Sequence, residues 1–191
     1  MHYVDIYRYT GKIKLNPERI IDTALKEFKN LGQTGVRSEI QWTSATLNSL
    51  YRIGRRFGCS VWVSSRFANE QDIDGGECVI WIKYDKSGFL ESGPVVAECE
   101  WSNPGDVKDD YEKPLLARAT VRVVVFDEGY CKNGAEAIAN KICDWVGAYE
   151  GSQKGDKFLL VGYEGDDESW CFRYFIILVN ESDQQPTITE L

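Results

Sequence analysis

The chain has 191 residues, of which 43% are hydrophobic and 13% aromatic, and its net charge is −8. This length suits one domain, and the composition excludes an intrinsically disordered chain because enough apolar side chains are present to form a core. The negative charge argues against a protein that coats nucleic acid nonspecifically, since such proteins are normally basic. We therefore expect one acidic, globular domain.

The residue types that bind metals or react covalently limit the kinds of active site that this chain can form. The single histidine is His2, and a histidine next to the chain end does not suit a catalytic triad or a zinc site. Oxygen ligands remain, which favour magnesium, manganese or calcium, and neither zinc nor an organic cofactor is expected. The six cysteines include no CxxC pair, which indicates free thiols in a reducing cytoplasm.

The N-terminal residues predict a strand and a helix rather than a targeting segment. Residues 1–10 alternate polar with apolar side chains and carry two charges, unlike a signal peptide, so a short strand is predicted over residues 4–9. Asn16 suits a helix N-cap, and Pro17 suits the first helical position. Apolar residues then recur at helical spacing up to Gly32, which ends the helix.

A second helix and three strands are predicted next. The helix is expected to begin at a cap formed by Thr43 or Ser44 and to end at Gly58. Three runs rich in β-branched and aromatic residues then predict strands over residues 60–67, 77–84 and 95–101. The links between these strands contain aspartate, serine and glycine, which form turns.

The last third of the chain is predicted to alternate helices and strands. Residues 120–126, TVRVVVF, are almost continuously apolar, as expected of a strand that is covered on both faces. A short helix precedes this strand and runs to Arg118, and Lys113 is expected in it. The alternative is that Pro114 begins the helix, which would leave Lys113 in a loop. The remaining predictions are a helix over 135–149, a hairpin of strands over 158–163 and 170–179, and a frayed polar tail from residue 181.

Together these elements predict an α/β fold with a mixed β-sheet flanked by helices. A single domain is expected over residues 1–180. It consists of a core (44–127), an N-terminal extension (1–43) and a C-terminal helix and hairpin (135–180), followed by a polar tail (181–191). No apolar run is long enough to cross a bilayer, so no membrane association is expected.

Two acidic residues in the third predicted strand are the most informative in the chain. Glu98 and Glu100 point to one face of this strand, while Cys99 points to the other. If the strand pairs with residues 120–126, both faces are covered, and adjacent buried carboxylates are then strongly unfavourable. A divalent cation bound by the two carboxylates would offset the free-energy cost of burying them side by side. The alternative is an edge strand whose acidic face is exposed to solvent.

The αβββαβ order and the Glu98-Cys99-Glu100 motif resemble the PD-(D/E)XK nuclease superfamily, which has a restriction endonuclease-like fold. In that family, an acid on the second strand and a D/E-x-K motif on the third strand bind magnesium. Glu98 matches the motif acid, and Glu100 stands where the family usually has lysine, as in members that read E-x-E. The resemblance covers roughly residues 44–127.

The resemblance implies one or two magnesium or manganese ions bound by Glu98, a second acid and the backbone carbonyl of Cys99. Glu77 is favoured as the second acid, and Asp74 and Asp85 are alternatives. For each of these three acids taken singly, turn formation is the favoured explanation.

The implied reaction is metal-assisted hydrolysis of phosphodiester bonds, with DNA as the expected substrate. Glu100 would position or deprotonate the attacking water. Lys113 or Arg118 would supply the charge of the missing lysine. Phosphate contacts would come from basic side chains, and these are Arg52, Arg55, Arg56, Arg66 and Arg118. For the first three, a solvated helix face is the alternative.

Two further functions remain open from the sequence. A catalytically inactive protein of the same fold that binds another protein is favoured by the acidic charge and by the missing motif lysine. An inhibitor or immunity-type protein, whose acidic surface meets a basic partner, is the other. The oligomeric state stays open, with a dimer as one option.

Overall fold

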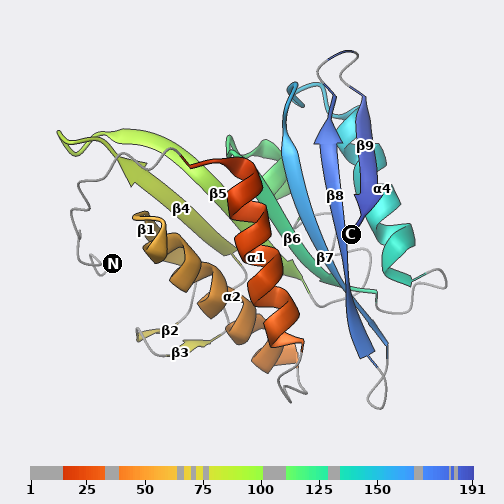
Figure 1. The fold of residues 1–191 in the computed structure, drawn as a ribbon, viewed down its shortest axis with the longest axis horizontal. Helices are drawn as coiled ribbons and strands as arrows, with labels where there is room; N and C mark the ends of the chain where they lie inside the picture. The colour runs from red at the N-terminus through yellow and green to blue at the C-terminus, as the bar shows by residue number, and fades with distance from the viewer. Residues whose placement is uncertain are drawn as a thin grey trace.

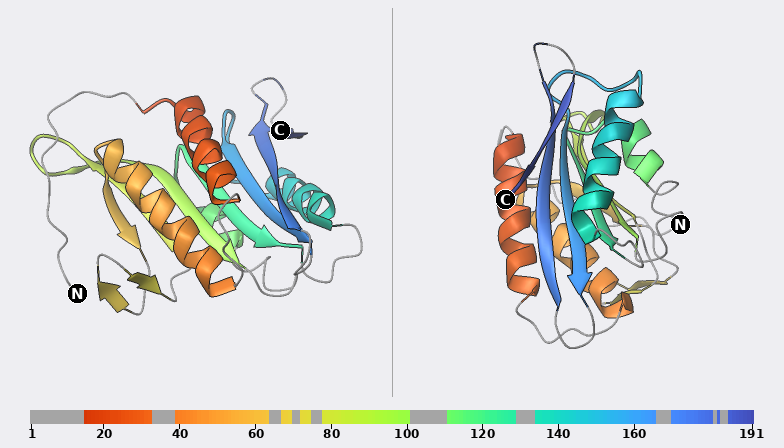
Figure 2. Two further views of the ribbon diagram at one scale, coloured as in Figure 1. Left: turned by 60° about the horizontal axis from the view of Figure 1, so that its bottom comes forward. Right: turned by 90° about the vertical axis from the view of Figure 1, so that its right-hand side faces the viewer.

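The computed structural model describes residues 15–32, 39–63, 67–69, 72–74, 78–100, 111–128, 134–165, 170–180, 182 and 185–191. A seven-stranded sheet with the order β1-β4-β5-β6-β7-β8-β9 lies at its centre. Helices α1 and α2 cover one face of this sheet, and α4 covers the other (Figures 1 and 2). The expected α/β fold with a mixed sheet between helices is therefore confirmed.

The helices are α1 (Pro17–Leu31), α2 (Glu39–Arg56) and α4 (Gly134–Ala148). The strands of the large sheet are β1 (Ser60–Val63), β4 (Cys78–Tyr84), β5 (Leu90–Glu100), β6 (Val121–Asp127), β7 (Lys157–Gly165), β8 (Trp170–Val179) and β9 (Pro186–Glu190). A second, two-stranded sheet consists of β2 (Phe67–Asn69) and β3 (Asp72–Asp74). A short helical segment covers residues 111–116. The predicted strand over residues 4–9 lies outside the described residues.

Helix α1 follows the sequence prediction closely. The Asn16 side chain accepts a hydrogen bond from the amide of Glu18 at 2.8 Å, as an N-cap does. Ile20, Ala24 and Phe28 lie on the buried face of the helix, against the sheet. The local signals of capping and helical spacing were therefore sufficient to define this helix.

The predicted start of the second helix is wrong. Helix α2 begins at Glu39, so the proposed caps Thr43 and Ser44 lie inside it. The reason is a contact that is distant in the sequence: the buried Trp42 ring packs edge-on against Phe172 of β8, with 4.9 Å between the ring centroids. Burial of this ring against the sheet favours a longer helix than the local signals predict.

The strand pairing places β5 and β6 inside the sheet. Strands β1, β4 and β5 form an antiparallel meander, and β5 and β6 are parallel neighbours. Strand β6 is parallel to β7 on its other side, and β7 and β8 form the predicted antiparallel hairpin. Residues 121–126 are all buried, as expected of a strand with both faces covered.

Two predicted segments differ in the structure. The strand predicted over residues 60–67 ends at Val63, and residues 67–69 belong to the small β2-β3 sheet. Residues 72–74, predicted as part of a turn, form β3 of that sheet. Pairing between β2 and β3 provides these short segments with backbone hydrogen bonds that a single-sequence pattern does not reveal.

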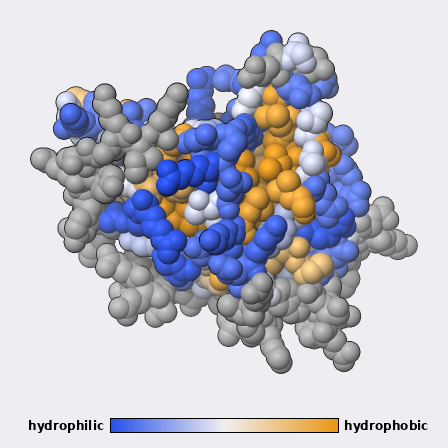
Figure 3. Space-filling view, in the orientation of Figure 1, coloured by the Kyte–Doolittle hydropathy of each residue, from blue (hydrophilic) through white to orange (hydrophobic). Residues whose placement is uncertain are grey.

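The two cores lie on opposite faces of the sheet. Buried residues of α1 and α2 pack against Val95, Ala97 and Cys99 of β5, whereas α4 packs against Val124 and Phe126 of β6. Figure 3 shows apolar atoms beside α1, where the helices leave part of the sheet uncovered. No helix in the described part of the chain is long and apolar enough to span a membrane.

Within the C-terminal tail, residues 186–190 form strand β9, contrary to the prediction of a frayed segment. Strand β9 pairs with β8, so the main sheet extends beyond the predicted domain boundary at residue 180. The Arg173 guanidinium donates two hydrogen bonds of 2.7 Å to the carboxylate of Glu190. It also reaches Glu164 of β7 and Glu136 of α4 at 3.2 Å each. These ion pairs and the strand pairing hold the tail in place.

We expect Gly54→Ala to destabilise the protein. A Cβ atom at this position would lie 2.6 Å from a methyl group of Val61 and 2.8 Å from the indole nitrogen of Trp81. Overpacking of this kind costs about 1–3 kcal/mol, which outweighs the gain of about 1 kcal/mol in helix propensity. Urea unfolding measures the change. Asn140→Ala, on an exposed position of α4, is the control, and equal stability of the two variants would contradict tight packing at Gly54.

The contribution of Glu190 to stability depends on pH. Arg173 holds the pKa of Glu190 below its ordinary value, chiefly by side-chain hydrogen bonding. Because the folded-state pKa is the lower one, the stabilisation is present above the unfolded-state pKa and is lost as the pH falls through the folded-state pKa. Glu190→Gln should therefore lower the melting temperature at pH 7, and the difference from the wild type should shrink towards pH 3. The exposed Glu150→Gln serves as the control, and a pH-independent difference would contradict this account.

Candidate active site

The two acids of the β5 motif share the sheet face that α4 covers. Glu98 lies opposite Cys78 of β4 and Val124 of β6, and Glu100 lies opposite Phe126. Residues paired directly across a sheet point to the same face, and Val124 and Phe126 belong to the core beneath α4. Both carboxylates therefore point away from α1 and α2.

Both carboxylates are buried within the sheet. Glu98 is 2% exposed and Glu100 is 8% exposed. Strand β5 has β4 on one side and β6 on the other, so the alternative of an exposed edge strand does not apply. Each carboxylate has interaction partners within the protein. Even so, two ionised carboxylates at this depth are stable only where positive charge or hydrogen-bond donors compensate for the lost hydration.

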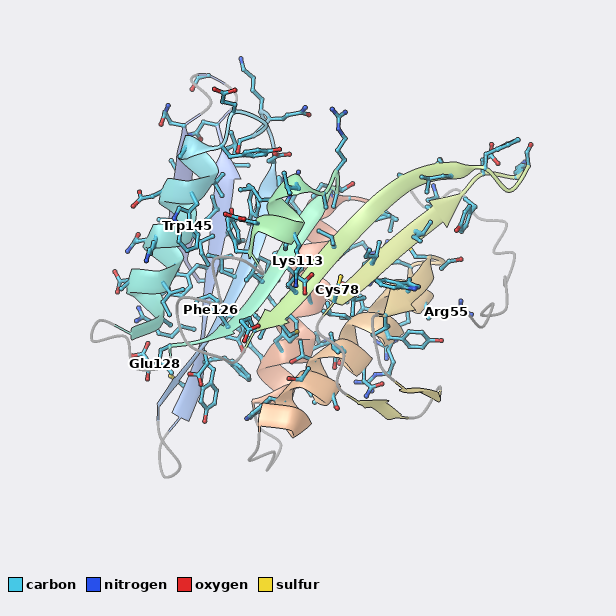
Figure 4. All side chains as sticks on the ribbon, turned by 180° about the vertical axis from the view of Figure 1, so that it is seen from behind. Arg55, Cys78, Lys113, Phe126, Glu128 and Trp145 are labelled. Carbon is cyan, nitrogen blue, oxygen red and sulfur yellow. The ribbon has the colours of Figure 1, made fainter. Side chains whose placement is uncertain are left out.

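The helical segment over residues 111–116 crosses the same face. Tyr111 is 1% exposed and packs in the core beneath α4, together with Leu115. Lys113 belongs to this segment and is exposed. Figure 4 looks onto this face, with Lys113 on the segment and Cys78 on β4 both near the middle of the sheet. The segment therefore carries a lysine above the strands that bear the carboxylates.

Pro114 lies within this segment and does not begin it, so of the two alternatives left open by the sequence, the one with Lys113 in the helix applies. Lys113 is consequently helical rather than part of a loop, and its carbonyl accepts a hydrogen bond from the amide of Ala117 at 3.1 Å. A proline is tolerated here because the amides in the first turn of a helix have no partner within the helix.

A buried arginine fixes the segment to the sheet. Arg122 of β6 is 5% exposed, and its Nε donates to the carbonyls of Pro114 at 3.0 Å and Ala117 at 3.2 Å. Its Nη1 lies 3.1 Å from Asp156 Oδ1, as an ion pair rather than an aligned hydrogen bond. The guanidinium also stacks over the Phe158 ring at 5.0 Å. Arg122 thus positions the backbone that carries Lys113.

The sequence patterns did not identify Arg122 as a positioning residue. The signal was available, because it is the only charged residue in the otherwise apolar run TVRVVVF. A charge inside a strand that is covered on both faces requires partners. Those partners are backbone carbonyls and an aspartate beyond α4, which no local pattern indicates.

The predicted phosphate-binding arginines of α2 do not lie with the carboxylates. Helix α2 packs against the opposite face of the sheet, and Figure 4 shows Arg55 on this helix, behind the sheet. Arg56 forms an ion pair with Glu27 of α1 at 3.0 Å, and Arg52 donates to Ser49 at 3.0 Å. Arg66 lies outside the described residues, and Arg118 is exposed just after the helical segment.

The structure distinguishes between the predicted alternatives for the second metal-binding acid. Asp85 accepts hydrogen bonds from the amides of Ser87 at 2.8 Å and Phe89 at 2.9 Å, so it caps the turn between β4 and β5. It lies seven residues along β4 from Cys78, the partner of Glu98, which is about 23 Å in a strand. Asp85 is therefore too far from Glu98 to share an ion with it.

Asp74 and Glu77 are the other two predicted acids. Asp74 is the last residue of β3, whose strand contacts α2 rather than the carboxylate face. The favoured acid, Glu77, directly precedes Cys78 and lies outside the described residues. Of the three predicted acids, Glu77 is therefore the one whose neighbour in the chain is paired with Glu98.

The donor atoms at Glu98 and Glu100 suit a hard divalent cation. Magnesium binds one or two carboxylates and fills its remaining positions with water or substrate phosphate. The carbonyl of Cys99 lies between the two acids in the chain, while its side chain is buried in the core beneath α1 and α2. Within the described ranges, no group of three or more histidine, cysteine, aspartate or glutamate side chains is placed to hold a metal.

Arg122→Met should destabilise the protein strongly. Removing one partner of a buried ion pair costs about 3–5 kcal/mol, and this change also leaves the carbonyls of Pro114 and Ala117 without their donor. Urea unfolding measures the loss. The matched control is Arg52→Met on the exposed side of α2, which should change stability by less than about 0.5 kcal/mol. Similar values for both variants would show that Arg122 does not anchor the segment.

Comparisons with known proteins identify no family for this chain. No family model matches it, and no curated protein matches it. Among solved structures, the central domain of yeast acetyl-CoA carboxylase is similar with a TM-score of 0.38 and 11% sequence identity. The match covers 85% of this chain and 28% of that chain.

Proposed function

We propose that this protein is a divalent-metal-dependent nuclease that hydrolyses phosphodiester bonds, with DNA as the expected substrate. The observation that carries the proposal is the pair of buried carboxylates, Glu98 and Glu100, on one face of the inner strand β5. Buried acids side by side are unfavourable without compensating charge. Each carboxylate has partners within the protein, and two carboxylates on one face of a strand also supply oxygen atoms that suit a hard divalent cation and the water that it binds.

The order of the core elements supports this proposal. Helix α2 is followed by the antiparallel strands β1, β4 and β5, then by the helical segment and by β6, which is parallel to β5. This is the αβββαβ order of the PD-(D/E)XK superfamily, with the small β2-β3 sheet inserted between β1 and β4. In that superfamily, the metal-binding motif lies on the third strand, which corresponds to β5 here.

The residues have separate roles in the proposed reaction. Glu98 and the carbonyl of Cys99 would hold a magnesium or manganese ion, with Glu77 as the favoured second acid. When bound, the ion lowers the pKa of a coordinated water and stabilises negative charge on the phosphate. Glu100 is more exposed than Glu98, at 8% against 2%, so it is the better placed to orient the attacking water.

Lys113 supplies the positive charge that the motif lacks. It stands on the segment that Arg122 anchors to the carboxylate face of the sheet. An ammonium group on this segment can contact a phosphate oxygen of a substrate that lies over β5. Arg118, exposed after the same segment, extends the basic character of this side. The α2 arginines have no role beside the carboxylates, because they lie on the other face.

A reducing cytoplasm is the proposed location. The described cysteines, Cys59, Cys78, Cys99, Cys143 and Cys171, are free thiols. Burial raises the pKa of Cys59 to about 11, so this thiol stays protonated and unreactive at neutral pH. Free thiols of this kind persist in reducing compartments, whereas secreted domains of similar size often form disulfides.

The metal site is tested by thermal unfolding with millimolar magnesium or manganese. An ion at about 100 times its dissociation constant stabilises the folded state by about 2.7 kcal/mol, so the melting temperature should rise. Glu98→Gln should abolish this rise, because the neutral amide keeps the shape of the side chain and removes its charge. A nuclease assay on single- and double-stranded DNA, with the same variant, then tests hydrolysis.

The control for this experiment lies on the same strand. Glu91 of β5 is exposed and pairs with Lys83 at 3.1 Å. Glu91→Gln removes one carboxylate of equal charge and should leave the metal response unchanged. A melting temperature that neither ion raises in the wild type would refute the proposal, as would a rise that persists in Glu98→Gln.

The second candidate is a catalytically inactive protein of the same fold that binds a basic protein. It is favoured by the net charge of −8 and by Glu100 at the position of the motif lysine. In this case the two acids need no cation, because each already has partners within the protein. Metal ions should then have no effect on the wild type.

A further inference from the structure

Strand β1 forms one edge of the main sheet and lacks the usual protection of an edge strand. Within the described part of the chain, β1 pairs with β4 alone, and their register continues over four residue pairs without a bulge. Its sequence, SVWV, contains neither a charged residue nor a proline. Edge strands normally carry such features, because these prevent pairing with a further strand. The outer backbone groups of β1 are therefore suited to pair with another strand.

The opposite edge of the sheet differs from β1 in this respect. Strand β9 begins with Pro186, which has no amide hydrogen, and it carries the charged Glu190, which is paired with Arg173. A proline and a charge are the features that make an edge strand unsuitable for further pairing. An additional strand of this sheet is therefore expected beside β1 rather than beside β9.

The side chains of β1 leave apolar surface open on one face of the sheet. Val61 is buried in the core beneath α1 and α2, whereas Trp62 points to the opposite face and is 52% exposed. Trp62 is paired with Ile80 of β4, which is itself only half-buried. Side chains of neighbouring strands lie about 4.5–5.5 Å apart. A strand that pairs with β1 would therefore cover part of the exposed Trp62 ring.

The sequence before α1 contains a segment whose side chains suit this edge. Residues 4–9, VDIYRY, lie outside the described residues, and their alternation predicts a strand. In a strand, Val4 and Ile6 point to one face, and Tyr7 and Tyr9 point to the other. Branched aliphatic side chains suit the covered face of β1, and tyrosines form favourable cross-strand pairs with tryptophan on the open face.

The chain between this segment and α1 is long enough to reach β1. In the first turn of α1, the guanidinium carbon of Arg19 lies 5.5 Å from the centroid of the Phe57 ring, and Phe57 is three residues before Ser60, where β1 begins. Even with both side chains extended, the path from the Arg19 backbone through Phe57 to Ser60 is about 25 Å, whereas the extended chain from Tyr9 to Pro17 spans about 26–29 Å. Figures 1 and 2 show the chain before Pro17 leaving α1 towards the side of the sheet that carries β1 and β4.

We propose that residues 4–9 of this chain pair with β1 in the antiparallel direction, as an additional edge strand of the main sheet. Because Tyr9 is tied to the first turn of α1, it lies at the Ser60 end of β1, so the segment runs from the Val63 end to the Ser60 end, opposite to β1. Its aliphatic side chains continue the face beneath α2, and its tyrosines cover Trp62. This inference is independent of the nuclease proposal, because the buried carboxylates belong to β5, on the far side of β4.

NMR on the full-length protein measures the pairing directly. Nuclear Overhauser contacts are expected between backbone protons of residues 4–9 and those of residues 60–63. Successive amides of a strand point to opposite edges, so the double variant Ile6→Pro with Tyr7→Pro removes a hydrogen bond to β1 in either register. It should abolish these contacts and speed hydrogen exchange of the outward β1 amides by about tenfold or more. The matched control, His2→Pro with Tyr3→Pro, lies just before the segment and should change neither.

The outcomes distinguish the chain's own segment from a second copy on this edge. Wild-type protein without contacts between the two segments would refute the proposal, and so would outward β1 amides that exchange equally fast in the wild type and in the Ile6→Pro, Tyr7→Pro variant. A mixture of isotope-labelled and unlabelled chains separates contacts within one chain from contacts between chains. Contacts within one chain support the proposal, whereas contacts that occur only between chains would show that a second copy pairs with β1 and would overturn it.

Discussion

The parallel pairing of β5 with β6 is the constraint on which the rest of the structure depends. It places β5 between two neighbours, and it buries Glu98 and Glu100 on the face that α4 covers. A parallel neighbour also requires a crossover connection, because the chain must return to the starting end of the strand. The helical segment over residues 111–116 lies in this connection. The same pairing therefore buries the acids and brings a lysine-bearing segment over the sheet.

Arg122 links this segment to the strand pairing. A buried guanidinium is tolerated where its donors and its charge are matched, and here backbone carbonyls, Asp156 and the Phe158 ring provide the match. Because the partners of Arg122 come from both the segment and the turn before β7, the arginine orders two connections at once. A hydrophobic residue in its place could fill the volume but could not hold the carbonyls of the segment, so the position of Lys113 would be less defined.

The elements that the sequence predicted well are those defined by neighbours in the chain. Helix α1 has its own cap and a regular apolar stripe, and β6 has a continuous apolar run. The start of α2 and the strand β9 were mispredicted because distant residues define them. Trp42 extends α2 through its contact with Phe172, and Arg173 fixes β9 through Glu190. Tertiary contacts override local propensity at these positions.

The candidate site was likewise predictable only where neighbours in the chain define it. The alternation of side chains along a strand was enough to place Glu98 and Glu100 on one face, but their burial depends on β6, more than twenty residues further along the chain. The site of Lys113 depends on Arg122, which acts through backbone carbonyls and so leaves no pattern of side chains to recognise. Since the net charge of −8 repels nucleic acid at long range, the proposed nuclease would have to bind its substrate through short-range contacts. The proposed cation beside Glu98 and Glu100 is a contact of that kind, because it does not require a basic surface.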